Sequence, residues 1–201
     1  MPAPHQSPEA QGVDVVVVGG SAGALEGLVT ALSPLPENYP LPIAVVVHLA
    51  PSDPSALARV LAARCALRVL EAEDKAPALP GTIYVAVPRY HLLLDSGPSL
   101  ALSVDDPVNF SIPSIDVLFE SATLACGGRV AGVVLSGANE DGAAGLAAIR
   151  AMGGVAVVQT PAEAPVDTMP RAAMRRCPEA AVLTAVEIAR FLLTLPSGFA
   201  P

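Results

Sequence analysis

Runs of apolar, β-branched residues alternate along this chain with segments in which apolar residues recur at helical spacing. The apolar runs lie at 13–19, 43–47, 130–135, 155–158 and 181–183. Uninterrupted runs of this length are typical of strands that are covered on both faces, as in parallel sheets. The segments with helical spacing lie at 23–33, 57–65, 113–125, 143–151, 170–176 and 185–195. The alternation predicts an α/β fold with a doubly wound, mostly parallel, Rossmann-like sheet.

The pattern changes between the second apolar run and residue 113. Four short strand-like pieces lie there, at 68–71, 82–87, 91–95 and 100–104. Turn-forming residues separate them, such as Asp95-Ser96-Gly97-Pro98, and no helical segment does. This spacing predicts an antiparallel hairpin excursion attached to the parallel sheet. Without an internal repeat or a long linker, we expect one domain over 13–195, a disordered tail over 1–12 and a short tail over 196–201.

The stretch that joins the first strand to the first helix is rich in glycine and places one hydroxyl at the junction. It reads Val18-Gly19-Gly20-Ser21-Ala22-Gly23-Ala24. Ser21 is expected beyond the end of the strand, near the positive end of the helix dipole. A nucleophile is one interpretation of this serine, and a turn that cradles a phosphate is another. The stretch fits neither the G-x-G-x-x-G pattern nor the P-loop, which needs a Gly-Lys pair.

Two further strand ends carry polar residues. His48 directly follows the run 43–47, and Asp141 lies in the loop after 130–135. Ligands of open α/β sheets bind outside the carboxyl ends of the strands, and serine, histidine and aspartate are the residues of a hydrolytic triad. A structural role for His48 and an N-cap role for Asp141 in the helix 143–151 are the plainer alternatives. His91, at the start of a short strand, is interpreted as structural.

Composition narrows the function classes. The formal net charge of −8 argues against nucleic acid as a partner, and no apolar run approaches the roughly 20 residues that cross a membrane. The first residues lack the features of a secretory signal. The three cysteines show no C-x-x-C spacing, which favours reduced thiols and a cytoplasmic protein. No cluster with metal-ligand spacing is visible, so no metal is expected.

The chain resembles the catalytic domain of bacterial chemotaxis protein-glutamate methylesterases, the CheB type. Five blocks in the family's order carry the resemblance and span residues 14 to about 190. They are Val18-Gly19-Gly20-Ser21-Ala22-Gly23-Ala24-Leu25, Val47-His48-Leu49-Ala50-Pro51, Pro113-Ser114-Ile115-Asp116-Val117-Leu118-Phe119, Val133 to Gly137 with Asp141 to Leu146, and Met169-Pro170-Arg171-Ala172-Ala173.

The resemblance implies a serine hydrolase that needs no cofactor. Ser21 would be the nucleophile, His48 the general base and Asp141 the residue that orients the histidine. The implied reaction is hydrolysis of glutamate methyl esters on methylated chemoreceptor helices, with glutamine deamidation as a second activity. We expect the Ala22 and Ala138 N–H groups to form the oxyanion hole. Met169 is assigned to substrate positioning.

The chain also departs from the family. Ile112 stands where the family usually has arginine, and Val47 and Ala138 replace glutamine and methionine. About a dozen residues precede the first strand, so we expect a stand-alone catalytic domain without a receiver domain. A catalytically weak module that binds a receptor or a signalling partner is the alternative function. A domain that binds phosphate or nucleotide is a third.

Overall fold

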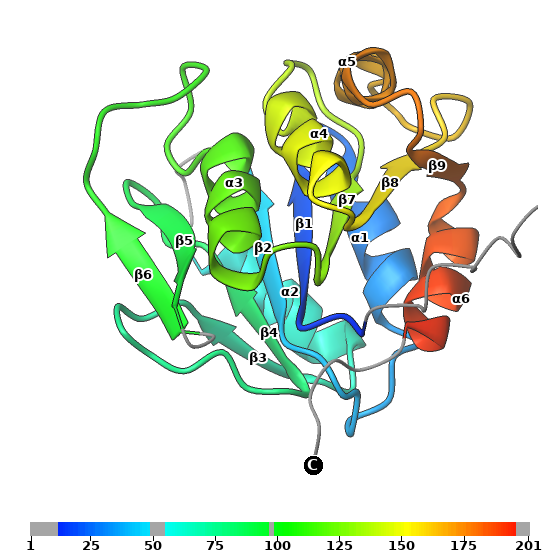
Figure 1. Cartoon of the computed structure of the whole chain (residues 1–201). Helices are drawn as coiled ribbons and strands as arrows, with labels where there is room; N and C mark the ends of the chain where they lie inside the picture. Colours follow the sequence, from blue (N-terminus) through cyan, green and yellow to red (C-terminus); the bar gives the residue numbers. More distant parts are fainter. Residues whose placement is uncertain (1–11, 49–54, 97–98, 196–201) are drawn as a thin grey trace, which may run out of the picture.

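A seven-stranded parallel sheet forms the centre of the fold (Figure 1). The computed structural model describes residues 12–48, 55–96 and 99–195, so the predicted tails lie outside the described residues apart from Gly12. The strands of this sheet are β1 (Val15–Gly20), β2 (Ile43–Val47), β3 (Arg68–Glu71), β4 (Thr82–Val85), β7 (Val130–Val134), β8 (Val155–Gln159) and β9 (Ala181–Leu183). Their order is β3-β4-β2-β1-β7-β8-β9, and all neighbours pair in parallel. The predicted mostly parallel sheet is confirmed.

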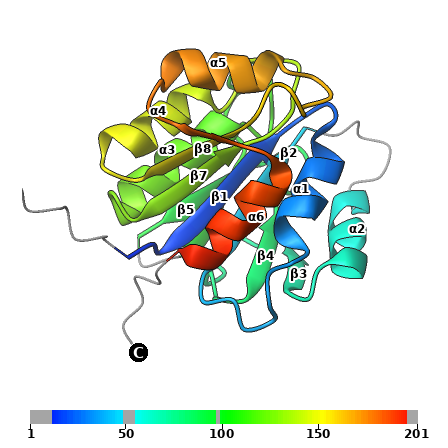
Figure 2. The ribbon, with the colours of Figure 1, turned by 90° about the vertical axis from the view of Figure 1, so that its right-hand side faces the viewer.

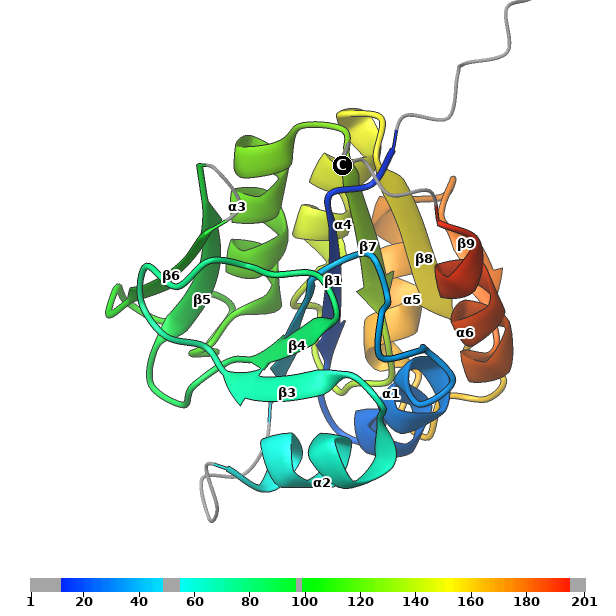
Figure 3. The same ribbon diagram turned by 90° about the horizontal axis from the view of Figure 1, so that it is seen from below.

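Helices cover both faces of this sheet, as the doubly wound prediction requires (Figures 2 and 3). One layer contains α1 (Ala24–Leu32), α2 (Ala56–Arg64) and α6 (Ala185–Thr194), and the other contains α3 (Ile115–Cys126), α4 (Ala143–Ala151) and α5 (Thr168–Arg176). Val16 and Val18 of β1 join the core under α1, whereas Val15 and Val17 join the core under α3. The continuous valine run reflects this burial on both faces. No described helix is long and apolar enough to cross a membrane.

The antiparallel excursion is smaller than the sequence predicts. Only β5 (His91–Asp95) and β6 (Ser99–Ser103) form an antiparallel hairpin, whose turn residues 97–98 lie outside the described part. The expectation for 68–71 and 82–87 is wrong, because β3 and β4 belong to the parallel sheet. No helix links these two strands. Their connection instead packs against β6, where Lys75 N–H donates to Leu100 O at 2.8 Å and Leu100 N–H to Ala76 O at 2.8 Å.

The strand order changes direction at β1. The chain passes from β1 to β2 on one side and later returns to β7 on the other side. Such switch points open a crevice at the carboxyl ends of the strands. Backbone pairing continues past the strands here, because His48 N–H donates to Gly20 O at 3.0 Å and Ser21 N–H donates to Ser136 O at 2.9 Å. The residues that follow β1, β2 and β7 therefore lie side by side.

Helix α3 approaches the sheet closely over Gly19. A Cβ at this position would overlap Ile115 Cγ2, and a Cβ at Gly142, where φ is +89°, would lie 2.6 Å from the same methyl group. Glycine at both positions therefore allows the first residue of α3 to sit against β1 and the loop after β7.

Gly19→Ala is expected to lower the free energy of unfolding by about 1–3 kcal/mol, because the new methyl group forces α3 away from β1. Urea unfolding followed by circular dichroism measures this change. Gly153→Ala is the matched control: a Cβ there meets nothing within 4 Å, although φ is +91°. Its cost of about 1–2 kcal/mol comes from the backbone alone. Only Gly19→Ala should be rescued by Ile115→Ala, which removes the Cγ2 methyl group that the new Cβ would overlap, and absence of rescue would contradict the steric explanation.

Candidate active site

Ser21 occupies the first position after β1, in the turn that leads into α1. Its carbonyl accepts the N–H of Ala24, the first residue of the helix, at 3.0 Å. Gly23 has a φ of +76°, and a Cβ there would lie 2.7 Å from Pro165 Cβ, so this turn requires glycine. The Ser21 side chain is partly exposed, and its hydroxyl forms no hydrogen bond with the described residues. A reactive hydroxyl is thus held on a rigid turn with its oxygen unoccupied.

Ser136 holds this turn from the side of β7. The side chain is fully buried, and its Oγ lies 2.7 Å from Ala22 O. The same oxygen accepts the N–H of Val166 at 3.0 Å, while Ser136 N–H donates to Gln159 Oε1 at 2.9 Å. The Ser136 hydroxyl therefore connects the serine turn to the 165–166 loop, and the Ser136 N–H connects it to β8. The sequence pattern does not predict that Ser136 holds the turn, because a single serine in a loop has no periodic signal.

His48 and Asp141 are brought into contact. His48 Nε2 lies 3.1 Å from Asp141 Oδ2, and the Asp141 side chain is fully buried, whereas 16% of the His48 side chain is exposed. The Nε2–H direction is not aligned with an acceptor, so the pair is an electrostatic contact rather than a well-formed hydrogen bond. No hydrogen bond joins His48 to Ser21 in the described residues. Poorly aligned hydrogen bonds between catalytic groups are common in enzymes without substrate, so this geometry is compatible with a catalytic pair.

The Asp141 carboxylate lies at the N-terminus of α3. Its donors are Ile115 N–H to Oδ2 at 2.7 Å, Ser114 Oγ–H to Oδ1 at 2.8 Å, Asn109 Nδ2–H to Oδ1 at 3.0 Å and Asp116 N–H to Oδ1 at 3.1 Å. The alternative in which Asp141 caps its own following helix is therefore wrong. Helix α4 has Gly142 as its N-cap and no side-chain cap, while Asp141 accepts the free N–H groups of a different helix.

The pKa of Asp141 is lowered in spite of its burial. Burial raises the pKa of a carboxylate, but the contact with His48 and the hydrogen bonds from Asn109, Ile115 and Asp116 outweigh that effect. Asp141 is therefore ionised at neutral pH. A fixed negative charge therefore lies beside the His48 imidazole.

Asp116 forms the mirror arrangement with α4. Its Oδ1 accepts the Gly145 N–H at 2.7 Å, and its Oδ2 accepts Asn109 Nδ2–H at 2.7 Å. Asn109 thus bridges the two carboxylates with one amide group. Burial, followed in part by the neighbouring charge of Asp141, raises the pKa of Asp116, although Gly145 N–H counteracts this. The sequence pattern does not predict the bridging role of Asn109, because its two partners, Asp116 and Asp141, lie 7 and 32 residues away along the chain.

His91 is structural, as the sequence predicts. The residue is almost fully buried, and its Nδ1 accepts the N–H of Ser114 at 3.1 Å. Its Nε2 lies 3.2 Å from Asp106 O, so the proton resides on Nε2. His91 therefore supports the start of α3 and does not belong to the crevice.

The three residues predicted to form the oxyanion hole or to position the substrate, Ala22, Ala138 and Met169, have different surroundings. Ala22 and Ala138 are exposed, and their N–H groups have no acceptor among the described residues. Met169 is fully buried, and its N–H donates to Gly137 O at 2.9 Å. A Cβ at Gly137 would lie 2.6 Å from Met169 Cε, so Met169 packs directly behind this loop. Any effect of Met169 on substrate therefore passes through the loop that carries Ala138.

Comparison with known proteins gives consistent matches. The family model for CheB methylesterase matches residues 16–192. A Myxococcus xanthus protein named protein-glutamate methylesterase/protein-glutamine glutaminase 5 is 40% identical over 182 residues, which is 85% of this chain and 52% of that protein, so the chain spans about half its length. A Leptospira interrogans protein named provisionally for the same two activities is 40% identical over 182 residues, covering 90% of this chain and 94% of that protein.

A solved structure also matches. The crystal structure of the Thermotoga maritima CheB methylesterase catalytic domain superposes with a TM-score of 0.86 at 29% identity. The match covers 90% of this chain and 97% of that chain. Residues 49–51, which follow His48 in the second sequence block, lie outside the described residues.

Asp141→Asn is expected to lower the free energy of unfolding by about 3 kcal/mol at pH 7, because an amide N–H would then face the N–H groups of α3. The pKa of folded Asp141 lies below the unfolded value of about 4, so the carboxylate stabilises the fold above that pH. This stabilisation is lost as the pH falls through the folded pKa. Urea unfolding from pH 7 to pH 3 should show the difference between wild type and variant shrink below about pH 4.

Asp167→Asn is the control for this experiment. Asp167 is 42% exposed and pairs with Arg171 at 2.7 Å, so its loss should cost less than about 1 kcal/mol. A difference between wild type and Asp141→Asn that stays constant across the pH range would contradict the ionised state of Asp141.

Ser136→Ala is expected to lower the free energy of unfolding by about 1–3 kcal/mol, because the Val166 N–H loses its buried partner. Ser33→Ala is the matched control, since the Ser33 side chain forms no hydrogen bond within the described part of the chain. Urea unfolding of both variants at neutral pH makes the comparison. Equal stabilities would show that Ser136 does not hold the turn.

Proposed function

This chain belongs to the CheB methylesterase family, and from that premise we propose that it hydrolyses the methyl esters of glutamate side chains in chemoreceptors. The observation that carries the proposal is the meeting of Ser21, His48 and Asp141 at the adjacent ends of β1, β2 and β7. These residues supply a nucleophile, a base and a buried charge to one crevice. The relatives named above are named for the same reaction.

The reaction proceeds through an acyl-enzyme. Ser21 Oγ attacks the ester carbonyl while its proton passes to His48. The tetrahedral intermediate then expels the methoxy group, which takes the proton from His48 and leaves as methanol. Water attacks the glutamyl-Ser21 ester with His48 again as base, and the products are the glutamate carboxylate and free Ser21. Asp141 stays ionised throughout and stabilises the imidazolium.

The position of Asp141 selects the basic nitrogen of His48. The carboxylate lies beside Nε2 and favours a proton on that atom. Nδ1 is then the unprotonated nitrogen, and it forms no hydrogen bond with the described residues. We therefore assign Nδ1 as the atom that accepts the Ser21 proton, so this triad uses the ring in the opposite sense to chymotrypsin-like proteases.

Two backbone groups are suited to stabilise the oxyanion. The Ala22 N–H lies at the N-terminus of α1, where the helix dipole favours negative charge. The Ala138 N–H belongs to the loop supported by Met169. Both N–H groups lack an acceptor in the described structure, so each is free to donate to the developing charge.

Deamidation of receptor glutamines belongs to the same proposal. It uses the same acyl-enzyme, with ammonia leaving in place of methanol. No observation on the described residues specifically favours the alternative function, a catalytically weak binding module. A cytoplasmic location, expected from the sequence, stays a prediction.

Ser21→Ala is expected to abolish methanol release from methylated receptor membranes, with a fall in rate of at least about 10³-fold. The melting temperature should stay within about 1 °C of wild type, because the Ser21 hydroxyl makes no hydrogen bond with the described residues. Release of labelled methanol measures activity, and Ser33→Ala serves as the control. Full activity of Ser21→Ala would refute the nucleophile, and no release by the wild type would favour the binding module.

A further inference from the structure

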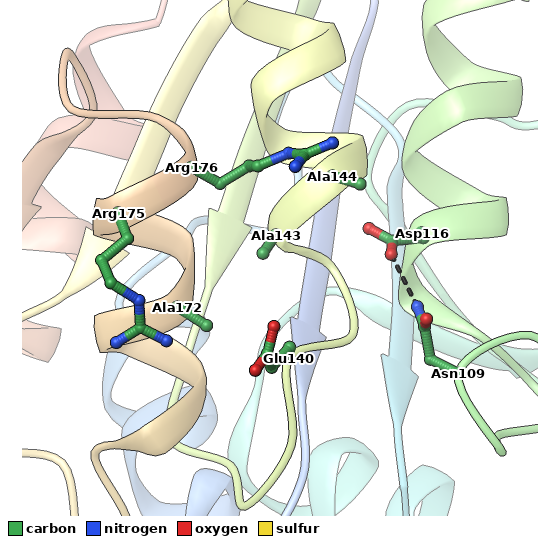
Figure 4. Close-up of a pocket in the computed structure, with 8 residues that line it drawn as sticks. All are labelled: Asn109, Asp116, Glu140, Ala143, Ala144, Ala172, Arg175 and Arg176. Carbon is green, nitrogen blue, oxygen red and sulfur yellow. Dashed lines mark hydrogen bonds between the residues drawn. The ribbon is translucent and has the colours of Figure 1, made fainter.

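A pocket of about 470 Å³ opens beside the catalytic residues, between α3, α4 and α5 (Figure 4). Asn109 and Asp116 form one wall, and Arg175 and Arg176 extend from α5 on the opposite side. The surface between them consists of small alanine side chains of α4 and α5. Glu140 lies at the edge of the pocket that leads to the loop of Asp141.

The two arginines are adjacent on α5 and have no partner among the described residues. The chain has 11 Lys and Arg against 19 Asp and Glu, and four of the 11 lie on α4 and α5. Arg171 pairs with Asp167 at 2.7 Å, and Arg150 Nη1–H donates to Gly154 O at 3.4 Å. Arg175 and Arg176 are exposed and form no ion pair or hydrogen bond with the described residues. Their charges are therefore available to an anionic partner.

One residue that lines the pocket is hydrogen-bonded to Asp141. Asn109, which lines the pocket, donates to Asp141 Oδ1 at 3.0 Å and to Asp116 Oδ2 at 2.7 Å. Helix α5, which carries both arginines, begins beside Gly137, where Met169 N–H donates to the Gly137 carbonyl. A partner seated in the pocket therefore lies next to the catalytic loops.

An exposed aromatic residue stands beside Asn109. The Phe110 side chain is fully exposed, and both Asn109 and Phe110 have positive φ values, of 51° and 59°. The two hydrogen bonds of Asn109 hold this turn in place. Aromatic residues and arginine are the residue types enriched at the centres of protein interfaces.

The charge of the enzyme creates the need for such a surface. The chain has a formal net charge of −8. Under the proposed function, on which this inference rests, each turnover leaves a glutamate carboxylate on the receptor, so a segment with several modifiable glutamates is itself acidic. Two acidic partners repel each other unless local positive charge meets the negative segment. Arg175 and Arg176 supply that charge on the α5 side of the pocket, while the carboxyl groups of Asp116 and Glu140 lie away from α5.

We propose that Arg175 and Arg176 form a docking site for free carboxylates on the substrate helix, next to the ester that Ser21 attacks. The occupant is an acidic helical segment of the receptor, with glutamate or aspartate on the same face as the methylated residue. Phe110 provides the apolar contact at the edge of the site. The arginines select the substrate through its charge and take no part in the chemical step.

The test compares Arg175→Glu/Arg176→Glu with wild type on methylated receptor membranes and on p-nitrophenyl acetate. The variant should lose about 10–100-fold in kcat/KM on the receptor, mainly through KM, and keep its rate on the small neutral ester. Added salt should slow the wild type on the receptor and affect the variant little. Arg64→Glu/Arg190→Glu, with the same charge change on helices of the opposite face, should stay within about threefold of wild type.

Direct binding separates docking from catalysis. A fluorescent, glutamate-rich helical peptide without an ester should bind wild type and Ser21→Ala equally, and bind the arginine variant at least 10-fold more weakly. Equal binding and equal kcat/KM of variant and wild type would overturn the docking site. Peptide binding that depends on the arginines, together with no methanol release by wild type, would instead overturn the proposed function. If the charge-reversal variant does not fold, Arg175→Gln/Arg176→Gln replaces it.

Discussion

The arrangement depends on one buried charge, the carboxylate of Asp141. A fully buried carboxylate is costly unless its oxygens are satisfied, and here four donors and the ring of His48 surround it. Two of these donors are backbone N–H groups at the start of α3. The residue that contacts the His48 ring therefore also fixes a helix to the loop after β7. The same hydrogen bonds fix the position of the Asp141 carboxylate and lower its pKa. A substitution that removes one of them therefore changes both.

Helices α3 and α4, on the same side of the sheet, exchange N-terminal caps. Asp141, which precedes α4, caps α3, and Asp116 on α3 caps α4 through Gly145 N–H. Asn109 joins the two carboxylates, so one amide serves both caps. Close packing of Ile115 over Gly19 and Gly142 makes this exchange sterically possible. The rigidity of the crevice thus arises from contacts between segments rather than from any one loop.

These contacts explain which parts of the fold and of the site can be predicted from the sequence and which cannot. Buried parallel strands have a strong pattern, and their carboxyl ends fall at one edge, so the positions of Ser21 and His48 follow from local signals. The position of Asp141 is predicted in the same way. Its role as a cap of α3 is not predicted, because a capping residue is normally assigned to the helix that follows it in the sequence. Ser136 contacts Ala22 across 114 residues, and such contacts leave no periodic trace. The sequence pattern wrongly assigns β3 and β4 to an antiparallel hairpin region. These strands pair in parallel, but a loop connects them in place of the crossover helix that usually links parallel strands.

The use of charge differs between the interior and the surface of this molecule. Inside, hydrogen bonds and the contact with His48 lower the pKa of Asp141, and no guanidinium or ammonium group lies within ion-pair distance of it in the described structure. When His48 takes a proton, Asp141 is therefore its charged counterpart, and no fixed cation competes for that carboxylate. An arginine paired with Asp141 would neutralise the carboxylate permanently and weaken the effect of that carboxylate on the imidazole. On the surface, Arg175 and Arg176 are exposed and unpaired among the described residues, so in a chain of net charge −8 they supply local positive charge that a negatively charged partner can meet.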